Sequence, residues 1–120
     1  SCTKGVSMDG MIKESVAMLF CHAIKLDGKD LRVEKPIFCR FMGQDFDCNS
    51  DDAKKLLELT MEKEDENIDT HISIVSNALH NEPYAKMNLL KQLNHIIFKS
   101  KMRDEDYDYF DKVKSSFFAR

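Results

Sequence analysis

The sequence contains few residues that interrupt regular helices. Among its 120 residues there are only four glycines and two prolines. These two residue types form most tight turns, so their scarcity argues against a β-sandwich with many short connections. A disordered linker is also excluded, because 42% of the residues are hydrophobic and this is enough for one core. The length is that of a single domain.

Long apolar runs are missing as well. No run approaches the roughly 20 residues that a membrane-spanning helix needs. Residues 1–10, SCTKGVSMDG, lack the apolar middle of a secretion signal. Cys21 and Cys39 lie inside apolar segments, where a buried, reduced thiol is expected. We therefore expect a cytoplasmic protein without a transmembrane segment, with a lipoprotein anchored through Cys2 as the alternative.

The chain has no excess of positive charge. Its 18 Lys and Arg residues stand against 21 Asp and Glu residues, which gives a net charge of -3. The one basic cluster, residues 99–103, is followed directly by three acidic residues, 104–106. A nucleic-acid backbone requires a sustained positive surface, so we expect no nucleic-acid partner.

Motifs of common enzymes and zinc sites are also absent. The sequence has no P-loop, no dinucleotide-binding glycine pattern and no nucleophile elbow. Its four cysteines form no CxxC pair and its four histidines no HExxH motif. Cys21 and His22 are adjacent, so on a helix their side chains diverge by about 100° and cannot act as nucleophile and base. We expect a protein that is not an enzyme.

Apolar residues recur every three or four positions along almost the whole chain, which is the period of an α-helix. This pattern predicts an all-α fold, a single compact bundle of about six to seven short helices over residues 11–118. Residues 1–10 form an N-terminal extension. The first predicted helix ends near Asp27 and Gly28, where glycine tolerates a left-handed terminus.

Local residues predict where later helices begin and end. Pro36 is expected to open the second helix, because proline suits the first turn, and Gly43 to end it. Asn49 or Ser50 is expected to cap the third helix. Pro83 is expected in the first turn of the fifth.

The fifth and sixth predicted helices each carry an apolar stripe that we expect to face the core. The fifth includes Tyr84, Met87 and Leu90. The sixth, with Asp104 as its expected cap, includes Tyr107 and Phe110.

Two segments of the chain, residues 15–41 and 88–117, share one pattern. Each is an apolar helix, a polar hinge, acidic residues and another apolar helix. Glu34 and Glu105 are the corresponding acids beside the second helix. The bundle is therefore expected to contain two similar helical hairpins.

At residues 23–34, AIKLDGKDLRVE, the chain resembles the TerB-like family. This is the helical domain of tellurite-resistance proteins, which also occurs at the front of certain DnaJ-type co-chaperones. The resemblance covers roughly residues 11–118. It implies an all-α bundle with an acidic, cation-binding surface in a stress-linked bacterial protein. The chain departs from the family pattern at the second hinge, where Lys99 and Ser100 replace an Asp-Gly pair, and at Pro36.

The predicted site consists of Asp27, Glu34, Asp104 and Glu105. Their carboxylates are ligands that a divalent cation such as Ca²⁺ or Mg²⁺ prefers. Interleaved cations such as Lys29 oppose this interpretation. The alternative is a helix end at Asp27 and first-turn acids that favour the helix dipole.

These observations lead to one functional expectation with two alternatives. We expect a non-enzymatic interaction or sensing domain that binds a protein partner through the acidic face, in a tellurite-resistance-type stress response. One alternative is a structural or dimerising domain without a ligand, for which Phe117 and Phe118 offer a contact. The other is a small enzyme that depends on a metal ion or on carboxylates.

Overall fold

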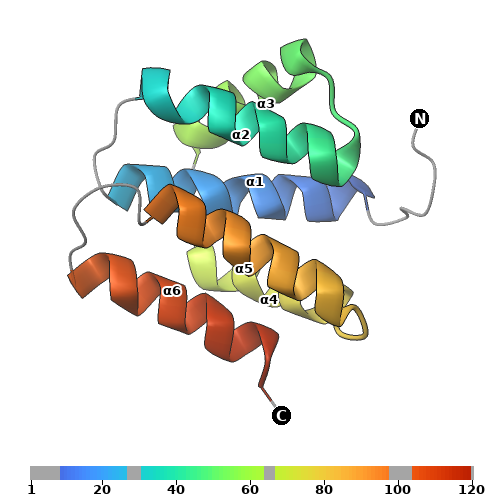
Figure 1. The fold of residues 1–120 in the computed structure, drawn as a ribbon, viewed down its shortest axis with the longest axis vertical. Coiled ribbons are helices and arrows are strands. Elements are labelled where there is room, and N and C mark those ends of the chain that lie inside the picture. The colour runs from blue at the N-terminus through green and yellow to red at the C-terminus, as the bar shows by residue number, and fades with distance from the viewer. Residues whose placement is uncertain (1–8, 27–30, 64–66, 98–103, 120) are drawn as a thin grey trace.

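The computed structural model describes residues 9–26, 31–63, 67–97 and 104–119. All regular secondary structure in these residues is helical, so the predicted all-α bundle is confirmed (Figure 1). None of the helices in these ranges has the length and apolar character to cross a bilayer. The helices are α1 (Asp9–Leu26), α2 (Leu31–Phe46), α3 (Ser50–Glu62), α4 (Ile68–Ala78), α5 (Pro83–Ile97) and α6 (Asp104–Phe117).

Helix α1 is the centre of the bundle. It contacts each of the other five helices, and in Figure 1 it runs through the middle of the molecule between α2 and α5. From Ser15 to Ile24, every residue except His22 is buried. A helix that is apolar around its whole circumference is stable only when neighbours cover every side.

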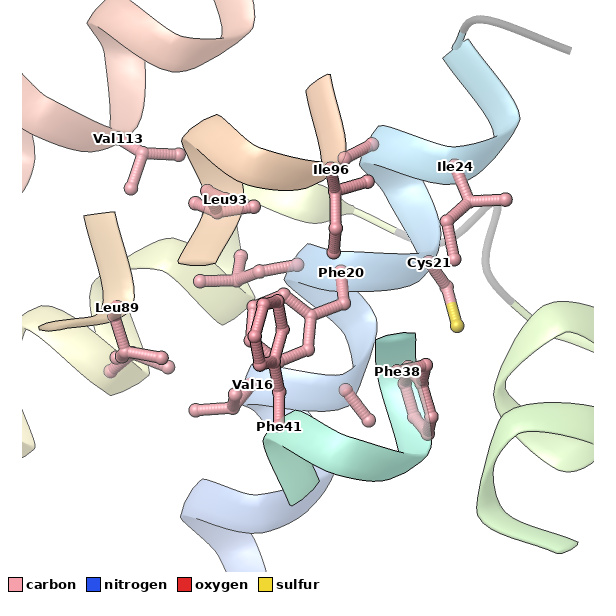
Figure 2. Packing of buried hydrophobic residues seen from close by; sticks show 14 of the residues in the cluster. Val16, Phe20, Cys21, Ile24, Phe38, Phe41, Leu89, Leu93, Ile96 and Val113 are labelled. Atoms are coloured by element: carbon pink, nitrogen blue, oxygen red, sulfur yellow. The ribbon is translucent and has the colours of Figure 1, made fainter. Parts of the chain in front are cut away.

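Aromatic packing joins α1 to α2. The Phe20 ring of α1 meets the Phe38 ring edge to face, with ring centroids 6.1 Å apart. The centroid of the Phe41 ring lies 5.7 Å from the centroid of the Phe20 ring. Figure 2 shows these rings beside Leu93 and Ile96 of α5. Such pairs add about 0.5–1.5 kcal/mol beyond the burial of their area.

Tyr109 joins α6 to α1. Its hydroxyl donates a hydrogen bond to the carbonyl oxygen of Leu19 at 2.8 Å, and its ring lies 4.6 Å from the His22 ring. The expectation that Tyr107 faces the core is wrong, because Tyr107 is 53% exposed whereas Tyr109 is 5% exposed. The hydrogen bond to Leu19 fixes the rotation of α6 that places Tyr109 inside.

The predicted boundaries of the second helix are wrong at both ends. Helix α2 begins at Leu31, so Pro36 lies inside it, where it removes one backbone hydrogen bond, to the carbonyl of Arg32. Gly43 also lies within the helix, and a Cβ atom there would be 3.3 Å from the carbonyl oxygen of Cys48. The left-handed residue that follows the helix is Asp47, with φ 57°.

The other boundaries agree better with the sequence. Asn49 caps α3, as predicted, since its side-chain oxygen accepts from the N–H of Asp52 at 2.8 Å. Asn67 caps α4 in the same way through the N–H of Asp69. Helix α5 begins at Pro83, also as predicted. Asp104 was expected to cap α6, but it is the first residue of the helix and lies in its first turn.

We expect Asp47→Gly to stabilise the protein, because a left-handed backbone costs non-glycine residues about 1 kcal/mol. Asp47→Val should lower the free energy of unfolding by about 1–2 kcal/mol. Urea unfolding measures both. As a control, Gln44→Gly introduces the same residue inside α2 and should destabilise by about 1 kcal/mol. If Asp47→Gly and Gln44→Gly lower the free energy of unfolding by the same amount, the backbone of Asp47 is not strained.

Candidate functional site

The four residues of the predicted acidic site differ in their surroundings. Glu34, in the first turn of α2, is buried with 2% exposure. Asp104 and Glu105 are exposed in the first turn of α6. Figure 1 places both first turns at the end of the bundle where α1 ends. Asp27 lies outside the described residues.

Across the part of the chain that the structure describes, no three or more His, Cys, Asp or Glu side chains form a group that could hold a metal ion. Because Asp27 is not among the residues searched, the cation site stays a prediction. The burial of Glu34 does bear on the expected docking face, since a side chain with 2% exposure offers a partner almost no surface.

A groove with a volume of about 510 Å³ lies between α5 and α6. The two helices lie side by side in Figure 1. The lining residues on α5 are three or four positions apart, so they share one face of that helix. The lining residues on α6 and directly after it are four positions apart and also share one face. Its lining consists of Met87, Leu90, Lys91, Asn94, Phe110, Lys114 and Phe118.

Exposed apolar side chains concentrate around this groove. Of the six exposed large apolar side chains in the described residues, four lie on α5, on α6 or directly after α6. They are Tyr84 at 89% exposure, Met87 at 47%, Tyr107 at 53% and Phe118 at 42%. The expectation that Tyr84 and Met87 face the core is therefore wrong.

The rotation of α5 explains this outcome. The helix carries two neighbouring apolar stripes, and only one of them packs into the core. The buried stripe contains Leu89, Leu93 and Ile96, which Figure 2 shows beside Phe20 and Val16. The other stripe faces the groove. The useful sequence signal is the width of the apolar surface on α5, which exceeds what one buried face requires.

The rim of the groove is positively charged. Lys91 and Lys114 line it, and among the described residues that line it there is no carboxylate. The ammonium nitrogen of Lys86 lies 5.3 Å from the centroid of the Phe118 ring, within the range of a cation–π interaction. On a chain with a net charge of -3, this surface favours anionic ligands.

Ser15 and His71 form a contact that resembles part of a catalytic pair. The Ser15 hydroxyl oxygen lies 3.1 Å from Nδ1 of His71. His71 lines a pocket of about 280 Å³, but Ser15 is not part of that lining and has 2% exposure. A nucleophile must reach its substrate, so this contact is better explained as satisfaction of a buried hydroxyl.

Asp45 connects the end of α2 to α5. Its Oδ1 atom accepts hydrogen bonds from the side-chain amides of Asn88 and Gln92, both at 3.1 Å. The Oδ2 atom of Asp45 and the Oε1 atom of Gln92 are buried without a hydrogen-bond partner. Burial raises the pKa of Asp45, and the bonds from Gln92 and Asn88 offset part of this rise. This cluster was not predicted from the sequence.

The chain was compared with known proteins. No family model matches it, and neither the curated proteins nor the solved structures give a match. The resemblance of residues 23–34 to the TerB-like family therefore stays a prediction. Part of that segment, residues 27–30, lies outside the described residues.

Asp45→Asn should raise the thermal midpoint at pH 7. The pKa of Asp45 in the folded protein lies above its ordinary value of 3.8. Its contribution to stability is therefore complete below about pH 3.8 and is lost as the pH rises through the raised pKa. Asparagine keeps the acceptor for Asn88 and Gln92 but does not ionise.

A series of thermal melts against pH tests this prediction. The difference in thermal midpoint between Asp45→Asn and the parent protein should be large at pH 7 and should decrease toward pH 3.8. Asp108→Asn, which removes an exposed carboxylate of α6, controls for the loss of one negative charge. If Asp45→Asn is less stable than the parent protein at every pH, ionisation of Asp45 does not destabilise the folded protein and the prediction is wrong.

For the predicted cation site, we expect the midpoint of chelator-stripped protein to rise on addition of Ca²⁺ or Mg²⁺. The stabilisation reaches about 2.7 kcal/mol at a hundredfold excess over Kd. Asp27→Asn combined with Glu34→Gln should abolish the rise. The matched pair Asp51→Asn and Asp52→Asn, in the first turn of α3, should keep it. No change of midpoint with either ion leaves a helix end and a buried carboxylate as the explanation.

Proposed function

We propose that this chain is a non-enzymatic interaction domain that binds an acidic, amphipathic helix of a partner protein in the groove between α5 and α6. One observation carries the proposal. Apolar side chains and lysines line a continuous hollow that none of the described helices covers.

The apolar part of the groove supports binding of a macromolecule. Met87 and Phe118 are each more than two-fifths exposed, and they adjoin Leu90 and Phe110 in one hollow. Contiguous apolar surface of this kind is typical of interaction sites. Covering it contributes about 25 cal/mol for each Å² of apolar area removed from water.

The shape of the surface favours a helix as the occupant. The stripe on α5 from Tyr84 to Asn94 extends about 15 Å along the helix axis, or nearly three turns. Tyr107, one turn before Phe110 on the same face of α6, extends the second wall. A groove between two packed helices accepts the side-chain ridge of a third helix, whose anchors recur at three- and four-residue spacing.

The charge of the surface favours an acidic partner. Lys91 and Lys114 lie within the groove and Lys86 lies over Phe118 at its end. Carboxylates on a partner helix would meet these ammonium groups at the rim, which increases the association rate and fixes the orientation of the helix. A second copy of this chain carries a net charge of -3, but the apolar residues of its own acidic helix α6 are largely buried.

The biological setting rests on the resemblance alone. Residues 23–34 resemble the TerB-like family, so we place the domain in a tellurite-resistance-type bacterial stress response. The docking surface that we propose is the α5–α6 groove, and not the acidic face expected from the sequence. The burial of Glu34 is the reason for the change.

Photo-crosslinking followed by binding measurements tests the function. A photoreactive amino acid replaces Met87 in the full chain, expressed in cells of the source organism. The crosslinked segment of any partner is then made as a peptide. We expect an acidic, amphipathic helix, whose affinity falls at least tenfold, or about 1.4 kcal/mol, for Met87→Glu and for Lys114→Glu.

Val33 provides the control. It is 49% exposed on α2, close to the 47% of Met87, and it does not line the groove. Val33→Glu should leave the affinity unchanged, and a crosslinker at Val33 should capture no such segment. Crosslinking to a second copy of the chain would overturn the proposal in favour of the dimerising alternative. Equal loss of affinity for Val33→Glu and Met87→Glu would overturn the assignment of the groove.

A further inference from the structure

A second hollow, with a volume of about 420 Å³, lies between α2 and α3. It shares no residue with the α5–α6 groove. Its volume falls within the roughly 300–1,000 Å³ of small-molecule sites. Its lining consists of Lys35, Pro36, Cys39, Arg40, Ser50 and Lys54.

Three cationic side chains from two helices meet in this hollow. Lys35 and Arg40 belong to α2, and Lys54 belongs to α3. The part of the lining that the structure describes contains no carboxylate, although Asp51 and Asp52 lie in the first turn of α3. This concentration of positive charge is unexpected on a chain whose net charge is negative, and it defines the ligand as an anion.

Arg40 and Ser50 add to the binding capacity of the hollow in different ways: the Arg40 side chain is held in place, and Ser50 supplies a hydroxyl donor. The Arg40 guanidinium carbon lies 5.4 Å from the centroid of the Phe41 ring, a cation–π distance that restricts its rotamers. Ser50 is the first residue of α3, so its hydroxyl is available close to the positive end of the helix dipole. An oxyanion with several acceptor atoms matches this mixture of ammonium, guanidinium and hydroxyl donors.

The Cys39 thiol is influenced by the positive charges of the hollow. Burial raises its pKa, while Lys54 and Lys35 act in the opposite direction. Both ammonium groups therefore influence the same point from different helices. Cys39 is half-buried, so a reagent in solution can also reach it.

We infer that the cleft between α2 and α3 binds the phosphate group of a small phosphorylated molecule. Lys35, Arg40 and Lys54 neutralise the phosphate, and the Ser50 hydroxyl donates to one of its oxygens. Pro36 and the Cys39 side chain form the less polar wall against which the rest of the ligand lies. This site is independent of the proposed docking of a helix in the α5–α6 groove.

Alkylation of Cys39 in the full chain tests the inference. Iodoacetamide reacts with the thiol, and mass spectrometry of the peptides follows Cys39 alone. The probes are inorganic phosphate and ribose 5-phosphate, with sodium chloride holding the ionic strength constant so that screening is equal in every sample. We expect both probes to slow alkylation, with ribose 5-phosphate half-effective at about 1 mM or below and at a lower concentration than inorganic phosphate.

Substitutions separate the cleft from general electrostatics. Lys35→Met combined with Lys54→Met keeps much of the aliphatic stems and removes two charges, so the half-effective concentration should rise at least tenfold. Lys55→Met combined with Lys63→Met removes two exposed charges of α3 and the residue after it, neither of which lines the cleft. This control pair should leave protection unchanged.

Three results would overturn the inference. One is equal alkylation with phosphate and with chloride. Another is protection by inorganic phosphate without protection by ribose 5-phosphate, which would exclude a phosphorylated organic molecule. The third is equal loss of protection in the two double variants. Calorimetric titration of ribose 5-phosphate provides a second measurement that does not depend on the thiol.

Discussion

The burial of residues 15–24 of α1, with His22 as the exception, is the constraint on which the rest of the fold depends. Between Ser15 and Ile24 this helix offers almost no polar surface, so it must be covered from every side. Five helices perform this task, and each packs against α1 with only one of its faces. The outer faces of these helices are then free to differ in chemistry. Both hollows lie there, between neighbouring outer helices.

The α5–α6 groove follows from how α6 is attached. Tyr109 is bonded to the Leu19 carbonyl, and Val113 and Phe117 are buried on the same side of the helix. With this rotation fixed, Phe110 is left half-buried at the edge of the core and Phe118 remains exposed. The opening between α5 and α6 is thus a result of the same contacts that attach α6 to the core.

The sequence predicted helical content well and helical rotation poorly. Apolar period and capping residues located α1, the start of α5 at Pro83 and the cap of α3 at Asn49. Periodicity shows which residues share a face, but on α5 two adjacent apolar stripes compete, and only the position of α1 decides which is buried. Tyr84 was therefore misplaced. The prediction that Pro36 opens the second helix failed for a related reason. The burial of α2 against α1 outweighs the one backbone hydrogen bond that proline removes inside the helix.

Neither hollow was predictable from the sequence, because each is lined by residues far apart in sequence whose proximity depends on helix packing. Lys91 meets Lys114 only because α5 and α6 are neighbours, and Lys35 meets Lys54 only because α2 and α3 are. The acidic residues of the chain are numerous, but none of those that the structure describes lines either hollow. The charge at these two hollows therefore differs in sign from the net charge of the chain, and local charge is what a ligand meets at a given site.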